Sequence, residues 1–268
     1  MRFHRRPAVV VLLAFACGLL LSLPACRKAG GARPLVVGME LAYPPFEMTD
    51  PSGQPAGISV EIARALAADL GRPLEIRNMA FDGLIPALRT GKIDLILSSM
   101  TATEERLKMI DFSEPYLRTG LCLLVRKEGP IEGIADADAE GRVLAVKQGT
   151  TGHAYAASNL KRAQLKLFDQ ESACVLEVAQ GKADAFLYDQ MSVYRHWRKN
   201  ENSTRALLVP FREEAWAIGI RKGEEVLRQE VNRSLAKFRA EGGFDRLGDQ
   251  YLAEEKAAFK ALGVPFFF

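Results

Sequence analysis

One short pattern occurs twice in this chain, and it restricts the possible folds more than any other feature. Residues 91–94 (Gly-Lys-Ile-Asp) and 181–184 (Gly-Lys-Ala-Asp) lie 90 positions apart, and each separates an expected helix end from a short apolar run. A helix, a turn and a buried strand in this order form the repeating unit of an α/β sheet. Gly-Lys turns before strands are common, so the match can be a coincidence, but a spacing that suits a small lobe favours duplication. We therefore predict two α/β halves built on the same plan.

Strands and helices alternate along the rest of the chain. Apolar runs predict strands at residues 35–39, 74–79, 93–97, 120–125, 143–146, 165–168, 183–187, 206–209 and 215–220. Amphipathic stretches predict helices at residues 58–70, 82–88, 152–160, 171–180, 191–200, 224–240 and 243–262. Strand–helix–strand units place the strands parallel, with helices over the sheet faces. The predicted fold class is α/β, with mostly parallel sheets flanked by helices.

Polar side chains follow the buried strand of the first copy, namely Ser98, Ser99, Thr101 and Arg106. Hydroxyl groups, the free N–H groups of a helix start and a guanidinium suit a carboxylate, because arginine offers two parallel donors to its two oxygens. A structural interpretation is equally open at this point. In it, Thr101 and Glu104 form a capping box and Arg106 is a surface charge.

The second copy ends in Tyr188 and Asp189, at the place equivalent to the two serines of the first copy. In open parallel sheets, ligands bind beyond the carboxyl ends of the strands. The two halves are thus each expected to present polar groups at equivalent places. Alternatively, Asp189 caps the helix that begins near residue 191.

The N-terminus predicts export from the cytoplasm. Arg2, Arg5 and Arg6 precede an apolar run at residues 8–21, and Leu-Pro-Ala-Cys follows at 23–26. This arrangement is typical of a secretory signal and resembles a bacterial lipoprotein signal, in which Cys26 carries the lipid. We expect a signal peptide at 1–25, a flexible tether at 26–33 and a membrane-anchored protein in the periplasm or at the cell surface. Ordinary cleavage near residue 25 and an uncleaved anchor are the alternatives.

Composition excludes several function classes. The formal net charge is only +3, and no basic stripe with interleaved aromatic residues suggests nucleic acid as a partner. No apolar run after residue 26 is long enough to span a membrane. No spacing of Cys and His suggests a metal site, and no cofactor is expected. Cys122 and Cys174 either pair or remain buried free thiols.

Six motifs, two of which contain the polar residues described above, occur in an order that identifies a family resemblance. They lie at residues 43–47, 81–88, 98–106, 110–116, 146–151 and 183–189. Together they resemble the extracellular solute-binding proteins that serve ABC importers of polar amino acids, over about residues 34–252. The resemblance implies two lobes joined by two hinge strands, with the ligand between them. It places the first lobe at 34–115 plus 217–268, the second at 121–211, and the hinges at 116–120 and 212–216.

The resemblance also implies roles for individual residues. Arg106 resembles the clamp for the α-carboxylate of the ligand, and Asp189 resembles the acceptor for its α-ammonium. Tyr43 and Phe81 resemble the aromatic residues that enclose the carbon stem. The expected ligand-binding set is Glu40, Tyr43, Phe81, Ser98, Ser99, Thr101, Arg106, Lys147, Thr150, Thr151, Tyr188 and Asp189.

The side chain of the ligand is expected to meet Glu40 and Lys147. One group of each sign favours a polar side chain, such as an amide, over a fully cationic one. The implied partner is an ABC transporter permease, and a monomer without enzymatic activity is expected. Two other functions stay open. One is a periplasmic dehydratase for prephenate-like or arogenate-like substrates, with Glu40 as the candidate proton donor. The other is a ligand-sensing partner of a signalling receptor.

Overall fold

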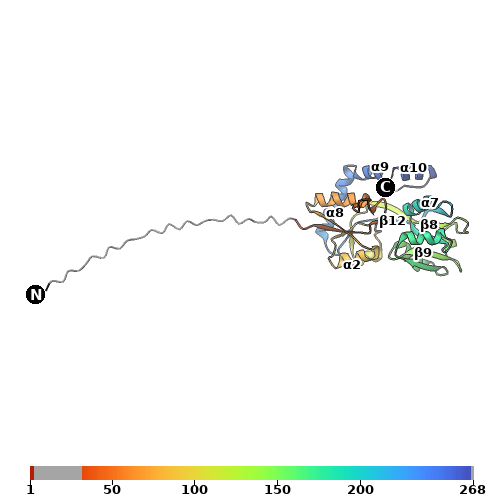
Figure 1. Cartoon of the computed structure of the whole chain (residues 1–268), viewed down its shortest axis with the longest axis horizontal. Helices are drawn as coiled ribbons and strands as arrows, with labels where there is room; N and C mark the ends of the chain where they lie inside the picture. Colours follow the sequence, from red (N-terminus) through yellow and green to blue (C-terminus); the bar gives the residue numbers. More distant parts are fainter. Residues whose placement is uncertain (3–31, 267–268) are drawn as a thin grey trace. The chain divides into compact units, whose positions relative to one another are not determined.

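The computed structural model describes residues 1–2 and 32–266, and residues 32–266 belong to one compact unit (Figure 1). Nearly all of the predicted signal peptide and of the tether falls outside the described residues, as do the lipidation candidate Cys26 and the last two residues. Within the described part of the chain, no helix has both the length and the apolar character needed to cross a membrane.

The first lobe is built on a five-stranded sheet. Its strands lie in the order β5 (Leu74–Asn78), β1 (Leu35–Met39), β6 (Leu95–Ile96), β13 (Gly219–Ile220) and β7 (Asp111–Phe112). A small antiparallel sheet is attached to it, with β2 (Ala42–Tyr43), β3 (Glu47–Thr49) and β4 (Pro55–Ala56). Its helices are α1 (Ile58–Asp69), the 3-10 turn η1 (Phe81–Gly83), α2 (Leu84–Arg89), α3 (Glu104–Leu107), α8 (Glu225–Ala240) and α9 (Gly243–Tyr251).

The second lobe is built on another five-stranded sheet. Its order is β10 (Gln164–Phe168), β9 (Val143–Lys147), β11 (Ala185–Asp189), β8 (Leu117–Arg126) and β12 (Thr204–Trp216). Its helices are α4 (Ile134–Ala137), α5 (Thr151–Asn159), α6 (Glu171–Ala179) and α7 (Gln190–Lys199). Strands β8 and β12 also form an antiparallel ribbon, from the pair Leu121–Arg212 to the pair Leu117–Trp216, where the chain passes between the lobes.

The α/β prediction is confirmed, but the sheets are mixed rather than mostly parallel. In each sheet, two pairings are parallel and two are antiparallel. The antiparallel pairings involve β13, β8 and β12, the strands on which the chain passes between the lobes or returns. The strand predicted at 215–220 is in fact two strands, β12 and β13, that belong to different sheets.

The two Gly-Lys-X-Asp turns have the same structural role. Asp94 accepts a hydrogen bond from Val36 N (3.1 Å), and Asp184 accepts one from Val143 N (2.8 Å). Each aspartate thereby fastens a neighbouring parallel strand, β1 or β9, to the strand that follows the turn, β6 or β11. The glycine that opens each turn has a positive φ, 73° and 72° respectively. Two arginines neutralise each aspartate, Arg33 and Arg72 in the first lobe and Arg126 and Arg142 in the second.

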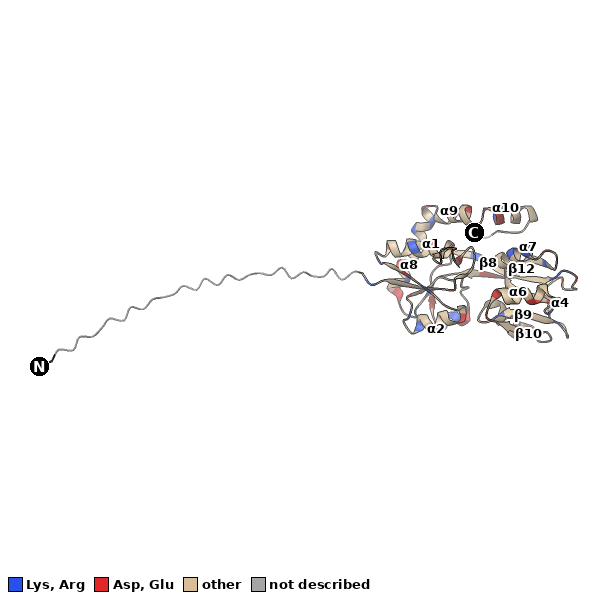
Figure 2. Ribbon diagram, viewed as in Figure 1, with Lys and Arg blue, Asp and Glu red and all other residues tan. Residues whose placement is uncertain are grey.

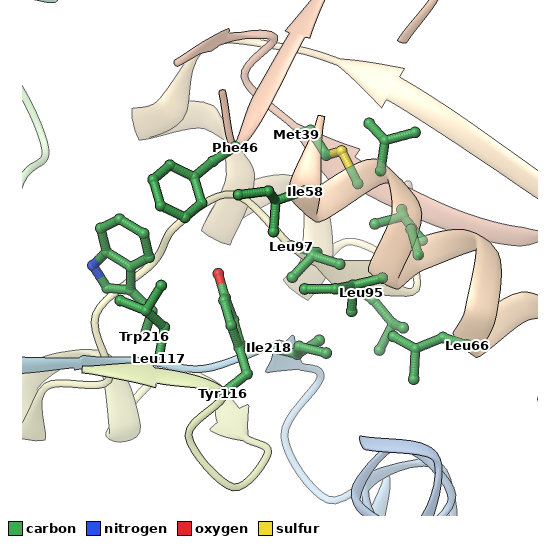
Figure 3. Packing of buried hydrophobic residues seen from close by; sticks show 14 of the residues in the cluster. Met39, Phe46, Ile58, Leu66, Leu95, Leu97, Tyr116, Leu117, Trp216 and Ile218 are labelled. Atoms are coloured by element: carbon green, nitrogen blue, oxygen red, sulfur yellow. The ribbon is translucent and has the colours of Figure 1, made fainter. Parts of the chain in front are cut away.

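The core of the first lobe reaches the passage between the lobes. Helix α1 buries Ile58, Ile62 and Leu66 against the sheet. Figure 3 shows the aromatic end of this core, where Phe46 and Trp216 lie next to each other. Their ring centroids are 5.0 Å apart at 84°. This end of the core supports the residues that face the second lobe.

The C-terminal segment differs from the predicted division of the chain. The prediction assigned everything after residue 217 to the first lobe, with one long helix at 243–262. The helix breaks at Leu252, and α10 (Ala253–Leu262) places Phe259 in the core of the second lobe. An amphipathic pattern indicates that a helix has an apolar face, but it does not indicate which surface covers that face.

Cys122 and Cys174 are free and buried in the core of the second lobe. Burial raises the pKa of the Cys174 thiol to about 12, and burial likewise raises the pKa of Cys122. Both thiols therefore stay protonated and inert at neutral pH. Of the two alternatives, the structure supports the free thiols.

Candidate functional site

A cavity between the lobes brings together eleven of the twelve predicted site residues. Lys147 is the exception, because it lines a neighbouring hollow together with Tyr43 and His196. Four residues of the cavity were not predicted: Glu47, Leu121, Glu214 and Trp216. The complete lining is Glu40, Tyr43, Glu47, Phe81, Ser98, Ser99, Thr101, Arg106, Leu121, Thr150, Thr151, Tyr188, Asp189, Glu214 and Trp216.

Arg106 is buried at the cavity, with only 7% of the residue exposed. Its guanidinium donates to the carbonyl oxygens of Thr101 (2.7 Å) and of Gly149 in the other lobe (3.0 Å). Burial lowers the pKa of Arg106 to about 10, so the group is still charged at neutral pH. A guanidinium has five N–H donors, and no other described residue accepts from the rest. The interpretation of Arg106 as a surface charge is therefore wrong.

The predicted capping box at Thr101 is also wrong. Helix α3 begins at Glu104, and its N-cap is Thr103, whose hydroxyl accepts from Arg106 N (3.2 Å). Thr101 lies earlier, in an isolated bridge with Trp216, and its hydroxyl donates to Glu214 (2.9 Å). The cap that fixes the start of α3 thus also holds the backbone of the arginine, while Thr101 is left to line the cavity.

Asp189 is buried at the cavity in the second lobe, and it has the predicted role of a helix cap. As the N-cap of α7, its Oδ1 accepts from Met191 N and Ser192 N, each at 3.1 Å. The same oxygen accepts from the hydroxyl of Tyr43 in the other lobe, at 2.6 Å. None of the described residues donates to Oδ2. Burial raises the pKa of Asp189 to about 7, although the bond from Tyr43 acts in the opposite direction.

Aromatic side chains form the apolar walls. Tyr43 stacks on Phe46 with ring centroids 5.4 Å apart, and its ring meets Tyr188 and Trp216 edge-on at 6.2 and 6.0 Å. Phe81 lies elsewhere on the lining, and the guanidinium carbon of Arg106 is 5.4 Å from its ring centroid. Tyr43, Phe81, Tyr188 and Trp216 thus give the cavity apolar surfaces beside its charged groups.

Glu40 and Lys147 form an ion pair across the two lobes. Lys147 Nζ contacts Glu40 Oε2, and the two residues are only 3% and 7% exposed. Glu40 is held in turn by its backbone N, which donates to Ser98 Oγ (3.0 Å). The nitrogen of Lys147 is also 5.7 Å from the ring centroid of Phe81. Of the two partners, Glu40 lines the cavity and Lys147 lines the neighbouring hollow.

Glu47 is a buried carboxyl that the sequence interpretation missed. Its Oε2 accepts from Ser59 (2.6 Å) and Ser99 (3.1 Å), and Ser98 lies within 3.5 Å of Oε1. Burial raises the pKa of Glu47 to about 8, so this group is neutral at pH 7. Ser99 reaches it from a left-handed backbone conformation (φ 47°), which is uncommon for a residue other than glycine. The motif at 43–47 contained this glutamate, but nothing in the motif indicated that it faces the cavity.

Glu214 is the second missed carboxyl. Its Oε2 accepts from the hydroxyls of Thr101 (2.9 Å) and Thr151 (3.0 Å), which belong to different lobes. Its Oε1 is buried and has no hydrogen-bond partner among the described residues. Burial raises the pKa of Glu214. Glu214 was not predicted because its position depends on how the ribbon of β8 and β12 passes behind the cavity, which periodicity does not specify.

Thr150 and Thr151 stand at the start of α5 in the second lobe. Thr150 is the N-cap: its hydroxyl accepts from His153 N (3.3 Å) and donates to Lys147 O (2.7 Å). The side chain of Thr150 is therefore used in the helix cap, and the first turn of α5, which begins at the cavity lining, has N–H groups without an intrahelical partner. Together with Arg106 they form a region suited to an anion.

Comparison with known proteins identifies the family. The family model of bacterial extracellular solute-binding proteins, family 3, matches residues 35–254. The L-arginine-binding protein of Pseudomonas aeruginosa is 31% identical over 250 residues, which are 90% of this chain and 96% of the relative. The glutamine-binding protein GlnH of the Bacillus subtilis ABC transporter is 30% identical and covers 83% of this chain and 82% of its own length.

A solved structure with a similar fold is the ancestral amino acid-binding protein AncCDT-1, described as a precursor of cyclohexadienyl dehydratase. It has a TM-score of 0.74 and 35% identity, and covers 81% of this chain and 95% of its own. These matches span nearly all of the compact unit. The chain therefore belongs to the family 3 bacterial extracellular solute-binding proteins.

Proposed function

We propose that this protein captures a polar L-amino acid in the cavity between its lobes and delivers it to the permease of an ABC importer. One observation carries the proposal. A buried guanidinium, Arg106, and a buried carboxyl, Asp189, face the same cavity from opposite lobes. Membership of the family supports the transport role.

The charges of the site suit a zwitterion. The α-carboxylate is expected at the unused N–H donors of Arg106, and the α-ammonium at Oδ2 of Asp189. Buried charges are costly unless each finds a partner, so a ligand with both charges is favoured over an anion or a cation alone. Because the two groups belong to different lobes, a bound amino acid stabilises the closed form.

The ion pair between Glu40 and Lys147 supports a neutral, polar side chain, such as an amide. An amide NH2 can donate to Glu40, which lines the cavity, without displacing Lys147, so the pair can stay in place. A cationic side chain would have to compete with Lys147 for the same carboxylate. Among the relatives, one binds glutamine and another arginine, which makes glutamine and arginine the decisive comparison.

We also propose a hinge, a membrane anchor and a monomeric state for this protein. The ribbon of β8 and β12, at the predicted hinges 116–120 and 212–216, would bend when the lobes open. The N-terminal region would anchor the protein to a membrane through a lipid on Cys26, with the binding lobes outside the cytoplasm. A monomer suffices for this role, because the cavity is lined by one chain.

A catalytic role is not part of the proposal. The candidate proton donor for a dehydratase, Glu40, is held by Lys147 instead of being presented to the cavity as a free acid. AncCDT-1, the precursor of a dehydratase, is itself described as an amino acid-binding protein.

Calorimetric titration of the protein with each standard L-amino acid tests the function. We expect binding at micromolar or lower Kd for glutamine or a closely related polar amino acid, weaker binding of its D-enantiomer and no turnover. Tightest binding of arginine would contradict the side-chain assignment alone. The lack of micromolar binding for every amino acid would contradict the function.

A further inference from the structure

The chain crosses between the lobes a third time at its C-terminus. Helix α9 packs on the first lobe, where Leu247 and Leu252 belong to the core. Leu252 ends α9 and begins α10, with φ −131° and ψ 15°. Figure 1 shows α9 and α10 in line along one side of the molecule, with α10 above α7 of the second lobe.

Helix α10 holds the second lobe through two consecutive residues of α7. Phe259 is 1% exposed, and its ring meets Tyr194 edge-on with centroids 5.0 Å apart. Next to this contact, Glu255 lies 3.8 Å from Arg195. Phe259 is a member of the core of the second lobe, so α10 is packed into that lobe rather than resting on its surface.

The residues after α10 return toward the first lobe. The ring of Phe266 is 5.5 Å from Phe259, and Phe266 packs against the cores of both lobes. A hollow behind the hinge is lined by this segment together with residues of both lobes and of the ribbon, including Phe46, Leu117, Met191 and Trp216. The contacts of the segment thus lie on both sides of the passage between the lobes.

We propose that residues 252–266 form a strap that holds the lobes together in the closed form and sets how readily the cleft opens. Rotation about the ribbon of β8 and β12 would separate the first lobe from α7. The strap touches both, so opening must pull Phe259 from its pocket, shift Phe266 or bend the chain at Leu252. Loss of contacts made only in the closed form shifts the equilibrium toward the open form.

The strap is also connected by packing to the ligand cavity. Phe46 and Trp216 line the hollow beneath the strap, and both contact the ring of Tyr43, whose hydroxyl bonds Asp189. Closure of the cavity and seating of the strap therefore involve one continuous set of packed side chains. The strap acts on the movement of the lobes, whichever ligand the cavity binds.

A distance measurement without ligand tests the strap. Spin labels on ketone-bearing unnatural amino acids at Arg89 in α2 and Ser158 in α5 avoid the native cysteines, and both positions are exposed. Electron–electron double resonance then reports the interlobe distance. We expect Phe259→Ala to at least double the fraction of long distances. Phe238→Ala is the matched control, because Phe238 contacts Phe244 in α9, within the first lobe (5.1 Å), and it should leave the distribution unchanged.

A charge reversal gives a second measurement that keeps Phe259 and the fold. Glu255→Arg places two like charges side by side at Arg195 and should lengthen the distances in the same direction, by a smaller amount. Glu254→Arg, at the exposed neighbouring position, should have no effect. Wild-type distributions in both Phe259→Ala and Glu255→Arg would overturn the strap, as would an equal shift in the controls. If Phe259→Ala does not fold, the comparison of Glu255→Arg with Glu254→Arg is sufficient to test the strap.

Discussion

The hydroxyl of Tyr43 donates a 2.6 Å hydrogen bond to Asp189 Oδ1 across the two lobes. The donor belongs to the small sheet of the first lobe, and the acceptor caps α7 of the second. This bond links closure of the cleft to the carboxyl that is proposed to receive the ligand. It leaves Oδ2 available while both lobes are already in contact.

Removal of that bond should weaken ligand binding. Tyr43→Phe keeps the stack on Phe46 but deletes the donor. A hydrogen bond to a charged group contributes about 1.5–3 kcal/mol, so we expect roughly a tenfold to hundredfold rise in Kd. Calorimetry on the best-bound amino acid measures it. Tyr155→Phe, in α5 outside the cavity, is the control and should bind like the wild type. An unchanged Kd in Tyr43→Phe would show that the bond has no part in binding.

Ligand affinity should rise with pH through neutrality. The pKa of Asp189 is raised to about 7 by burial, so a large part of the population is protonated at pH 6. The α-ammonium needs the ionised carboxylate, and binding must therefore release protons. We expect roughly tenfold tighter binding at pH 8 than at pH 6. Titration at both values in two buffers of different ionisation enthalpy measures the affinity and the proton release. Asp189→Asn should bind the ligand weakly at both pH values. A wild-type Kd that does not change with pH would contradict the role of Asp189 as the acceptor for the α-ammonium.

The free energy of unfolding should fall as pH rises, whereas ligand affinity should increase. The pKa of Glu47 is about 8 in the folded protein and near 4.5 when the chain is unfolded. The unfolded state therefore loses this proton first as pH rises. The contribution of the protonated Glu47 carboxyl to the free energy of unfolding is complete below about pH 4.5 and is lost as pH rises toward 8.

Replacement of the titrating carboxyl should remove this dependence. Wild type is expected to lose on the order of 3–5 kcal/mol more than Glu47→Gln between pH 4.5 and 8. Urea denaturation at several pH values, without ligand, measures the difference. Glu128→Gln, at an exposed position, is the control and should follow the wild type. Parallel curves for wild type and Glu47→Gln would mean that Glu47 is ionised in the folded state.

The pair Glu40–Lys147 should determine which side chain is accepted. Lys147→Met leaves a buried carboxylate without its partner, which favours a cationic ligand, so the preference should move from glutamine toward arginine by at least tenfold. Glu40→Gln should move it away from arginine. Breaking a buried pair costs about 3–5 kcal/mol of stability, and thermal unfolding should detect that loss in each variant. Competition between glutamine and arginine measures the preference. If the ratio of the two Kd values is unchanged in both variants, the pair does not determine specificity.

Much of this architecture was predictable from the sequence because it depends on local signals. Strand β1 has the predicted limits, and α1 differs from the prediction by one residue. The repeat at 91–94 and 181–184 predicted two similar halves, and the matched roles of Asp94 and Asp184 support that interpretation. Eleven of the twelve predicted site residues share one cavity because polar residues at the carboxyl ends of strands converge.

The missed features depend on long-range packing. Glu214 reaches the cavity because β12 pairs antiparallel with β8 and continues between the lobes, and no local pattern specifies that pairing. Glu47 is buried by serines that are distant in sequence, Ser98 and Ser99. Phe259 joins the core of the second lobe because α10 turns at Leu252, whereas the helical pattern continues through that residue.

The central claim is that Arg106 binds the carboxylate of an amino acid. Calorimetric titration of Arg106→Ala with the amino acid that binds the wild type most tightly tests it most directly, with Arg233→Ala, an exposed arginine of α8, as the control. Removal of one partner of a buried charge interaction costs about 3–5 kcal/mol, so Kd should rise at least a hundredfold in Arg106→Ala and stay unchanged in Arg233→Ala. A folded Arg106→Ala protein with the Kd of the wild type would contradict the account.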